Sequence, residues 1–541
     1  MSSLVLQKTG NRVRIGPAGD TTQPQRIHSL ASFVDMAPEA KALASSFSKR
    51  VNDRYWRLEY AKLVAAEGFA VLGQADEIAR VAGSGDDPVL FDNVIKSDRV
   101  SVAAARALSA TGHAVDGAGR ASLFLRLRYG LSMGVAMAAW LSTLIRHGWG
   151  NRLPSEAGSG LIIAVHGEVS NRTGHVLAAA AQNSSVSAAI VLGRPRSALR
   201  TISREWASRF GLADIKLSRP ISFAAAFKSM PELIRLLRAG AAILGDTGYS
   251  ARWSDEIAVL YRMCLGACSR AWWRKQGAST AVVVYGQTGL ADTSMLEEAQ
   301  QAAGARTVHW VHGVSGGWNF AGYSNLGLFK CGHDAILHRS LPGYGKTASI
   351  VLPKPDRSGR EGAQWLLLTN YAHPTNPLSG HGAIDLEIAT VRLVADAAKR
   401  SGLDIGALVW RPHPMFWSLP SEIVKQVLAE TSATGMRVPR PDDPAPQFKT
   451  FGAVLCTPST AALDVLRAGI LPVIVAPHRL PEGSAYSAFP LHATDAETLV
   501  HSVGEIGDAV AESRLYDDAW QRIAPGPGAV SMGDVLDLLD D

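Results

Sequence analysis

Two apolar runs that break abruptly into proline-containing polar motifs constrain this chain most. Residues 407–410 (Ala-Leu-Val-Trp) run into Arg-Pro-His-Pro at 411–414, and residues 453–456 (Ala-Val-Leu-Cys) run into Thr-Pro-Ser-Thr at 457–460. Short runs of this composition are typical of strands buried on both faces of a parallel sheet. In an open α/β sheet, ligands bind at the carboxyl ends of the strands. The pattern therefore predicts one binding edge that carries a histidine and a Ser/Thr pair.

The same alternation of apolar run, loop and helical pattern fills the chain from residue 161 onward. Strands alternating with helices indicate parallel sheets covered by helices on both faces. Strands are predicted at 161–165, 189–192, 281–285, 307–311, 365–368, 407–410, 453–456 and 471–475.

Two stretches rich in glycine, proline and polar residues, 148–160 and 353–362, are typical of linkers. Before the first linker the pattern is helical, at 39–72 and from 101 onward, and no alternating strand pattern stands out. The predicted fold class is α/β: two tandem doubly wound, Rossmann-like units with an extra N-terminal helical region. The predicted divisions are an N-terminal helical region at 1–150, a Rossmann-like acceptor unit at 155–355, a Rossmann-like nucleotide-binding unit at 356–510 and C-terminal helices at 511–541.

Charge and cysteine content narrow the classes of partner. A net charge of +6, from 54 basic and 48 acidic residues, is modest for 541 residues. Because no basic block stands beside an aromatic platform, we expect no nucleic-acid binding. The four cysteines form no CxxC pair, which favours packing over metal binding and suits a reducing cytoplasm. The first residues are polar and show no secretory signal pattern.

The longest apolar run covers residues 130–145, with Arg126 and Arg128 before it and Arg146 after it. At 16 residues it is short for a membrane span, which needs about 20. A helix buried in the core is the first interpretation. The alternative is peripheral membrane contact through 126–146, with the helix lying in the interface at the inner face of the membrane.

The strand-end motifs of the second unit are suited to holding a phosphate. Prolines on both sides of His413 forbid a helix there and present the imidazole rigidly. Ser459 and Thr460 stand at a helix start, where hydroxyl and backbone N–H groups can form an anion site. A turn histidine and an ordinary helix cap remain the alternatives for each motif taken alone. The candidate nucleotide and phosphate residues are Arg411, His413, Pro414, Thr457, Ser459, Thr460 and, for ribose hydroxyls, Asp464.

The first unit offers candidates for a general base. His312 follows a strand and precedes Gly313, and His166 with Glu168 follows another strand. A histidine or carboxylate with a pKa near neutrality can take the proton of an attacking hydroxyl. An ordinary turn histidine is the alternative in each case. Further residues expected to line the cleft or bind the acceptor are Asn171, Gly286, Gly313 and His373.

Other reaction classes fit less well. Ser315 lies in a G-x-S-x-G pattern, but no helical pattern follows it as a nucleophile elbow requires. Gly345-Lys-Thr347 ends like a phosphate loop, but Ser340 occupies the position of the required earlier glycine. No Asp-x-Asp motif ends a strand, so we expect neither a catalytic metal nor a cofactor.

Taken together, the motifs resemble those of CDP-glycerol glycerophosphotransferases (the teichoic acid polymerases) and related bacterial capsule transferases. That family has a Trp-His-Gly-like strand end, then Arg/Lys-x-His-Pro, then Asp-Tyr-Ser-Ser followed by an acidic helix residue. The similar segments here are Trp-Val-His-Gly at 310–313, Arg-Pro-His-Pro at 411–414, and Thr-Pro-Ser-Thr at 457–460 with Asp464. GT-B sialyltransferases and polysialyltransferases share the His-Pro and Ser-Ser/Thr motifs. The resemblance spans about residues 161–506.

The resemblance implies a metal-independent, inverting GT-B glycosyltransferase with a CMP- or CDP-linked donor and a glycan or lipid-linked acceptor. His312 would be the base, and His413, Ser459 and Thr460 would bind the donor phosphate. The implied product is a bacterial surface glycan such as capsule, lipopolysaccharide or a teichoic-like polymer. Two alternatives stay open: a sugar-nucleotide epimerase of the same two-unit fold, and a non-catalytic, membrane-associated scaffold.

Overall fold

The computed structural model describes secondary-structure elements at 4–9, 12–17, 25–26, 89–91, 115–116 and 123–147, and most of the chain from residue 160 to residue 540. Several connecting stretches lie outside the described residues, among them 148–159, 167–170, 287–290, 312–323, 372–380, 478–484 and 524–531. The chain divides into two compact units, formed by 1–38, 65–120 and 353–523, and by 39–64, 121–352 and 524–541.

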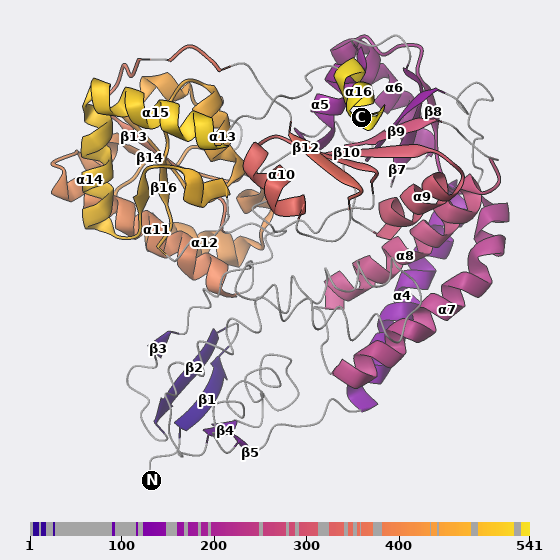
Figure 1. The fold of residues 1–541 in the computed structure, drawn as a ribbon. Coiled ribbons are helices and arrows are strands. Elements are labelled where there is room, and N and C mark those ends of the chain that lie inside the picture. Colours follow the sequence, from indigo (N-terminus) through magenta and orange to yellow (C-terminus); the bar gives the residue numbers. More distant parts are fainter. Residues whose placement is uncertain are drawn as a thin grey trace. The chain divides into compact units, whose positions relative to one another are not determined.

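The prediction of a purely helical N-terminal region is wrong, because its first residues form a β-sheet (Figure 1). β1 (Leu4–Thr9) pairs antiparallel with β2 (Arg12–Pro17), with Thr9 opposite Arg12. The strand order is β3-β2-β1-β4-β5, where β3 is Gln25–Arg26, β4 Val89–Phe91 and β5 Val115–Asp116. The helical patterns at 39–72 and 101–108 lie outside the described residues.

A sheet signal was present in this region. β1 begins with the apolar run Leu-Val-Leu, and in β2 Val13 and Ile15 alternate with Arg12 and Arg14. Gly-Asn at 10–11 separates the two strands, and a two-residue connection of this composition is a hairpin signal. The charged residues interspersed in both strands masked the pattern.

A seven-stranded parallel sheet forms the middle of the chain, in the order β12-β11-β10-β9-β6-β7-β8. Sequence order reverses between β6 and β9, which are hydrogen-bonded neighbours. The bounds are β6 Leu161–His166, β7 Val186–Leu192, β8 Lys216–Ser218, β9 Val282–Tyr285, β10 Arg306–Trp310, β11 Leu326–Phe329 and β12 Lys346–Ser349. Of these strands β6, β7, β9 and β10 were predicted, whereas β8, β11 and β12 were not.

Helices cover both faces of this sheet. Side chains of α4 (Leu123–His147), α7 (Phe223–Thr247), α8 (Trp253–Trp273) and α9 (Ala291–Ala302) form one core with the sheet. Side chains of α5 (Asn171–Ala181), α6 (Arg196–Phe210) and α16 (Met532–Asp540) form the core on the opposite face. α10 (Gly332–Arg339) packs on β11 and β12.

The apolar run at 130–145 is a helix of this core, as the first interpretation had it. Tyr129, Ala136, Trp140 and Leu144 of α4 are buried, and the Tyr129 hydroxyl donates to the Leu237 carbonyl of α7 at 3.1 Å. α4 therefore belongs with the seven-stranded sheet and not with a separate N-terminal region.

The second parallel sheet has five strands in the order β14-β13-β15-β16-β17, so sequence order reverses around β13. Figure 1 shows helices on both sides of it. The strands are β13 Trp365–Thr369, β14 Leu408–Pro412, β15 Ala453–Cys456, β16 Val473–Val475 and β17 His492–Ala493. The helices are α11 His381–Arg400, α12 Ser421–Ser432, α13 Thr460–Arg467, α14 Ala496–Gly507 and α15 Ala509–Ile523. Of the five strands, all but β17 were predicted.

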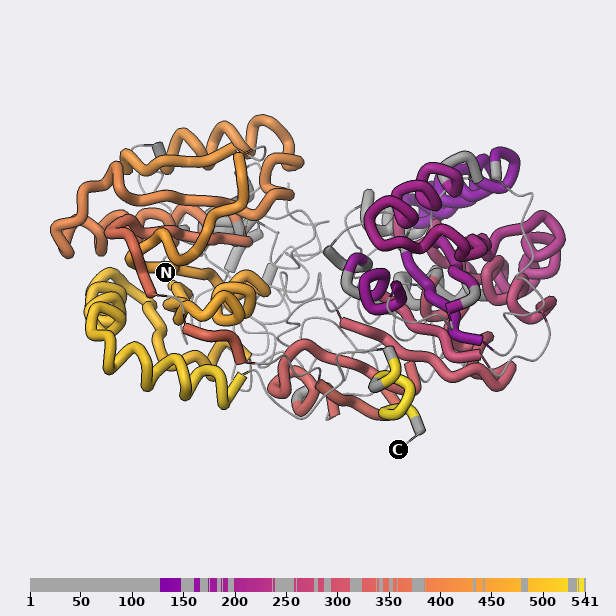
Figure 2. Tube along the Cα trace, turned by 90° about the horizontal axis from the view of Figure 1, so that it is seen from above, coloured from indigo at the N-terminus to yellow at the C-terminus, as the bar shows by residue number. Residues whose placement is uncertain are grey.

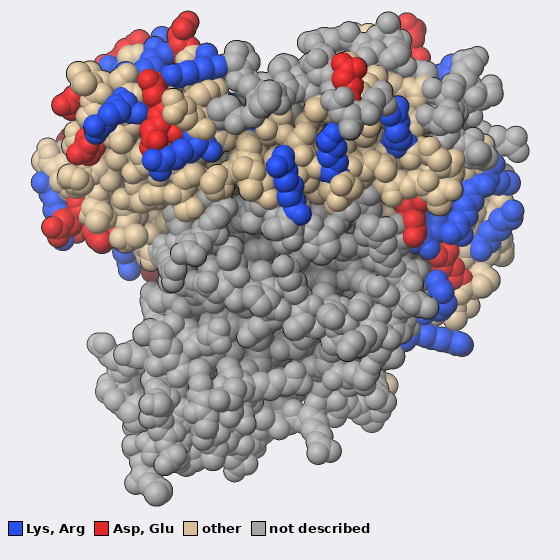
Figure 3. Space-filling model, in the orientation of Figure 1, with Lys and Arg blue, Asp and Glu red and all other residues tan. Residues whose placement is uncertain are grey.

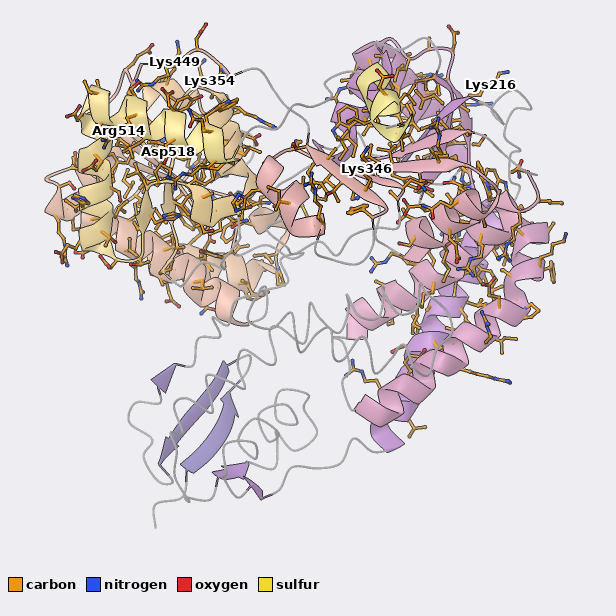
Figure 4. All side chains as sticks on the ribbon, viewed as in Figure 1. Lys216, Lys346, Lys354, Lys449, Arg514 and Asp518 are labelled. Carbon is orange, nitrogen blue, oxygen red and sulfur yellow. The ribbon has the colours of Figure 1, made fainter. Side chains whose placement is uncertain are left out.

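The second predicted linker, 353–362, is partly built into this second sheet's unit. Arg360 donates to the carbonyls of Gly452 (3.1 Å) and Leu471 (2.8 Å), which precede β15 and β16. Its guanidinium also pairs with Glu512 of α15 at 2.8 Å, and both side chains are about nine-tenths buried. Lys354, labelled in Figure 4, pairs with Asp517 at 2.6 Å.

The C-terminal helices do not form one segment. Tyr516 of α15 is buried and donates to the Leu466 carbonyl at 2.9 Å, so α15 completes the five-stranded unit. α16 instead packs on the seven-stranded sheet, where Val535 is buried and Lys346 donates to the Leu538 carbonyl at 3.4 Å. Figure 2 shows α16, yellow, beside the red strands of that unit.

The backbone around Gly362 is packed too closely for a side chain. A Cβ at residue 362 would lie 2.0 Å from the Thr450 carbonyl oxygen, whereas a Cβ at Gly504 of α14 would meet nothing within 4 Å. We expect Gly362→Ala to destabilise the five-stranded unit by about 3 kcal/mol, the upper range for overpacking. Gly504→Ala, the control, should stabilise by about 0.5–1 kcal/mol through helix propensity. Urea unfolding of the two variants measures both; similar stabilities would contradict the packing described here.

Candidate functional site

The candidate site is the carboxyl edge of the five-stranded sheet, where β13 lies between β14 and β15. Thr369 is paired with Pro412, and Leu368 is paired with Cys456. Continuing this register, Asn370 after β13 and His413 after β14 are level with Pro458, the second residue after β15. His413 and the 457–460 motif flank β13, two interstrand spacings or about 10 Å apart at the backbone. This edge is also where the strand order reverses, the usual place for ligands in such sheets.

His413 is held as a helix cap immediately after β14. It is the N-cap of a 3-10 helix, Pro414–Ser418, and its side chain accepts a hydrogen bond from the Met415 N–H. The acceptor is Nδ1, at 3.2 Å. Because Nδ1 accepts, the proton of the neutral ring is on Nε2, which is then a donor. The flanking prolines thus set both the position and the tautomer of an imidazole whose Nε2–H suits an anionic oxygen.

Ser459 is the N-cap residue of α13, but its side chain does not cap the helix. Its backbone is extended (φ −156°, ψ 163°), as in most N-caps, yet its hydroxyl makes no capping hydrogen bond. Asp495, the N-cap of α14 in the same unit, does cap: a reciprocal capping box joins it to Thr498. The Ser459 hydroxyl is therefore not used to cap α13, and it stands at a helix start, a place where backbone N–H groups can bind an anion.

Thr457 has a structural task. It is fully buried, its N–H donates to the Leu368 carbonyl at 2.9 Å, and its hydroxyl donates to Asn370 Oδ1 at 2.9 Å. Asn370 returns two bonds, from its N–H to the Thr457 hydroxyl (3.1 Å) and from Nδ2 to the Pro458 carbonyl (3.2 Å). This Asn370–Thr457 pair joins the ends of β13 and β15. Thr457 therefore positions Ser459 and is not itself placed to touch a ligand.

A buried carboxylate supports the centre of the edge. Glu387 of α11 accepts from the Thr369 hydroxyl and, at 3.0 Å, from the Tyr371 N–H, and Trp410 Nε1 donates to the Thr369 hydroxyl at 2.9 Å. Burial first, and then the Glu387 charge, raise the pKa of Tyr371 well above its ordinary value. These contacts hold residues 369–371 where Asn370 can reach Pro458.

The other residues predicted on this edge differ in their roles. Arg411 is occupied by a loop, since its guanidinium donates to the carbonyls of Asp443 (3.1 Å) and Pro444 (2.7 Å). Asp464 is 54% exposed and lies 3.9 Å from Arg467. Its charge adds to the burial that raises the pKa of the Cys456 thiol, so this thiol stays neutral. Thr460 opens α13, and Pro414 is exposed at the start of its 3-10 helix.

In the seven-stranded unit the described candidates stand at the reversal of strand order. His166 ends β6, and Gly286 follows β9 with its N–H donating to the Ala164 carbonyl at 3.2 Å. Asn171 is the first residue of α5. Glu168, His312, Gly313 and His373 lie outside the described residues; the last described residue before His312 is Val311, bonded to the Leu328 carbonyl at 2.9 Å.

The sequence interpretation missed a buried aromatic and histidine cluster near the end of β10. His309 bonds through Nδ1 to the Tyr344 hydroxyl, and the ring of His338 stacks on Phe329 at 4.6 Å. Burial lowers the pKa of His338 to about 4, so it is neutral at physiological pH. It missed Asn370 and Glu387 as well, and of these only Asn370, directly after a buried strand, carries a local signal.

Within the described residues, no group of three or more His, Cys, Asp or Glu side chains is placed to hold a metal ion.

Comparisons with known proteins assign this chain to no family. No protein-family model matches the chain, and no curated protein matches it. Among the solved structures that match is a crystal structure of Anabaena Alr3699/HepE in complex with UDP and glucose. The match covers 67% of this chain and 95% of that chain, at 8% identity and a TM-score of 0.37. A likeness this weak says nothing of the residues at the edge described above.

Alanine substitutions at the N-cap residues of α13 and α14 should affect thermal stability differently. Ser459→Ala should leave thermal unfolding unchanged, because no capping bond is lost, although a bonded serine cap typically contributes about 1 kcal/mol. Asp495→Ala, the matched control, should lower the unfolding temperature. Backbone and side-chain bonds from Thr498 hold the pKa of Asp495 below its ordinary value. The stability lost in Asp495→Ala should therefore be greatest above about pH 4, the ordinary pKa of an aspartate. The loss should shrink as the pH falls below that value, because the wild-type carboxylate then becomes protonated. A clear destabilisation by Ser459→Ala would show that its hydroxyl caps α13 after all.

Proposed function

We propose that the chain is a glycosyltransferase that transfers a sugar unit from a nucleotide-activated donor by single displacement with inversion and without a metal ion. The observation that carries the proposal is the position of His413 and Ser459: they lie at the same edge of the sheet, on either side of β13. The order of the strand-end motifs, similar to that of teichoic acid polymerases and GT-B sialyltransferases, supports the same class.

The edge supplies what a leaving nucleotide phosphate requires. As the bond between the sugar carbon and the phosphate oxygen breaks, negative charge grows on the phosphate. The Nε2–H of His413 donates to one phosphate oxygen. The Ser459 hydroxyl and the first N–H groups of α13 donate to others, and the helix dipole favours the charge. These donors are positioned before the reaction by the prolines that flank His413 and by the Asn370–Thr457 pair.

The seven-stranded unit supplies the acceptor side in this proposal. The acceptor hydroxyl attacks the sugar carbon, a new carbon–oxygen bond forms on the face opposite the departing phosphate, and the hydroxyl proton passes to a base. We assign His312 as that base from its similarity to the family motif, with His166 and Glu168 as the alternatives. The two parallel sheets then act as the acceptor and donor halves of a GT-B enzyme.

The donor and product follow from the resemblance. Both related families use cytidine-activated donors, which favours a CMP- or CDP-linked donor. The acceptor is a glycan or a lipid-linked glycan, and the product is a surface polymer such as capsule, lipopolysaccharide or a teichoic-like chain, built in the cytoplasm.

Nucleotide binding tests the donor half. A thermal-shift and calorimetry series with CMP, CDP, UDP, GDP and ADP should show a preference for the cytidine nucleotides. His413→Ala should weaken binding roughly ten- to a hundredfold, the range for a hydrogen bond to a charged group, and Ser459→Ala by less. His501→Ala, an exposed histidine on α14 of the same unit, should have no effect. Preference for UDP or GDP would overturn the cytidine assignment, and unchanged binding in His413→Ala would overturn the site.

The base is tested by separating transfer from binding. His312→Ala should abolish transfer, because no group then takes the acceptor proton, while nucleotide affinity stays within about twofold of wild type. Transfer is followed as acceptor-dependent release of nucleotide. If His166→Ala or Glu168→Gln alone had this effect, the base would lie after β6. Turnover of a sugar nucleotide without any acceptor would favour the epimerase alternative, and full transfer activity in both His312→Ala and His413→Ala would contradict the mechanism.

A further inference from the structure

The outer face of α4 is apolar where a surface helix is normally polar. Its inner face packs into the core, but Leu127, Leu131, Val135, Leu141 and Ile145 point outward with 65, 57, 41, 48 and 70% of their surface exposed. Between Arg128 and Arg146 the helix has no charged residue on any side. The exposed stripe is about 27 Å long at 1.5 Å per residue. A helix that is apolar on both faces normally has a partner on each.

The neighbouring helix α7 carries the same feature together with positive charge. α4 and α7 pack side by side in one core, joined by the Tyr129–Leu237 hydrogen bond (Figure 1). On α7, Phe227 and Ile234 are 76 and 41% exposed. Of the ten large hydrophobic side chains exposed in the described residues, seven therefore lie on these two helices. An accumulation of this kind marks a docking surface, because single exposed hydrophobic residues are otherwise scattered.

Basic side chains lie near the apolar residues of both helices. Lys228, Arg235 and Arg238 are exposed on α7, and Arg128 and Arg146 lie near the two ends of the α4 stripe. The acidic residue among the described side chains of α7, Glu232, is paired with the buried Arg270 of α8. Figure 3 shows blue Lys and Arg side chains gathered at the right-hand edge, where α7 lies. The surface thus combines exposed hydrophobic side chains with exposed basic side chains.

We propose that the α4–α7 face docks on the surface of an anionic lipid bilayer. Apolar side chains that enter the headgroup boundary, surrounded by Lys and Arg that bind acidic headgroups, are the features of an interfacial helix. The same positive charge disfavours a second copy of the chain on this face, because two such surfaces repel. In the part of the chain that the structure describes, no helix is long and apolar enough to cross the bilayer, so contact is with one leaflet. The surface shares no residue with the carboxyl-edge site, so the inference stands independently of the transferase assignment.

Vesicle flotation of the full chain tests the proposal. The protein should float with phosphatidylcholine vesicles that contain phosphatidylglycerol, float poorly with phosphatidylcholine alone, and lose binding as salt rises. Leu131→Glu with Ile145→Glu should reduce binding to the anionic vesicles at least about tenfold, because both apolar anchors are lost. Ile336→Glu on α10 (63% exposed) and Val510→Glu on α15 (80% exposed) are the matched controls and should bind like wild type.

A charge variant keeps the test independent of the apolar substitutions. Arg146→Glu should weaken binding by more than the factor of roughly five expected for each basic side chain near an anionic surface, because it also adds a repelled charge. Lys425→Glu, on exposed α12 of the other unit, should not. Failure of the wild-type chain to float with anionic vesicles, or equal losses in the controls, would overturn the proposal. The proposal would also be overturned if the wild-type chain formed a dimer and the double variant Leu131→Glu, Ile145→Glu dissociated it without changing vesicle binding. The partner of this face would then be a second copy of the chain.

Discussion

The hydrogen bonds between Asn370 and Thr457 are the contact on which the candidate site depends. They join the ends of β13 and β15 at the point where strand order reverses, a place where the two chain segments would otherwise diverge toward opposite faces of the sheet. A third bond, from Asn370 to the Pro458 carbonyl, sets the turn that leads into α13. Ser459 is therefore held by a neighbouring strand, which leaves its own hydroxyl out of helix capping.

Two further sets of contacts fix the strands that carry this edge. Buried Glu387 accepts from Thr369 and from the Tyr371 N–H, so the loop that carries Asn370 is anchored to α11. A buried carboxylate is costly unless its bonds are satisfied, and here it binds both residues that border Asn370. At the opposite, amino-terminal edge, Arg360 binds the carbonyls before β15 and β16 and pairs with Glu512. The strands that bear the site are thus fixed at both ends.

The elements with the strongest signals were predicted from the sequence because their cause is local. The run at 161–165 is buried on both faces of the sheet, so every residue in it is apolar. The short strands β11 and β12 escaped prediction, because Gly327 and the polar Lys346 and Thr347 give neither an apolar run nor a clean alternation. The N-terminal hairpin escaped for a related reason: its apolar residues are few, and in β2 they alternate with Arg12 and Arg14, so that the pattern resembles a polar segment.

The sequence by itself determined that two sets of parallel strands form and that His413 and Ser459 follow buried strands, because proline and apolar runs act on the nearest residues alone. Only the tertiary structure decided which strands are neighbours, and so that β13 separates the two motifs and that Thr457 and Arg411 are occupied by Asn370 and by the 443–444 loop. It also decided that α4 buries one apolar face and exposes another. The bonded residues Leu368 and Thr457 are 89 positions apart in the chain, and Tyr129 and Leu237 are 108 apart, so no local pattern encodes these contacts.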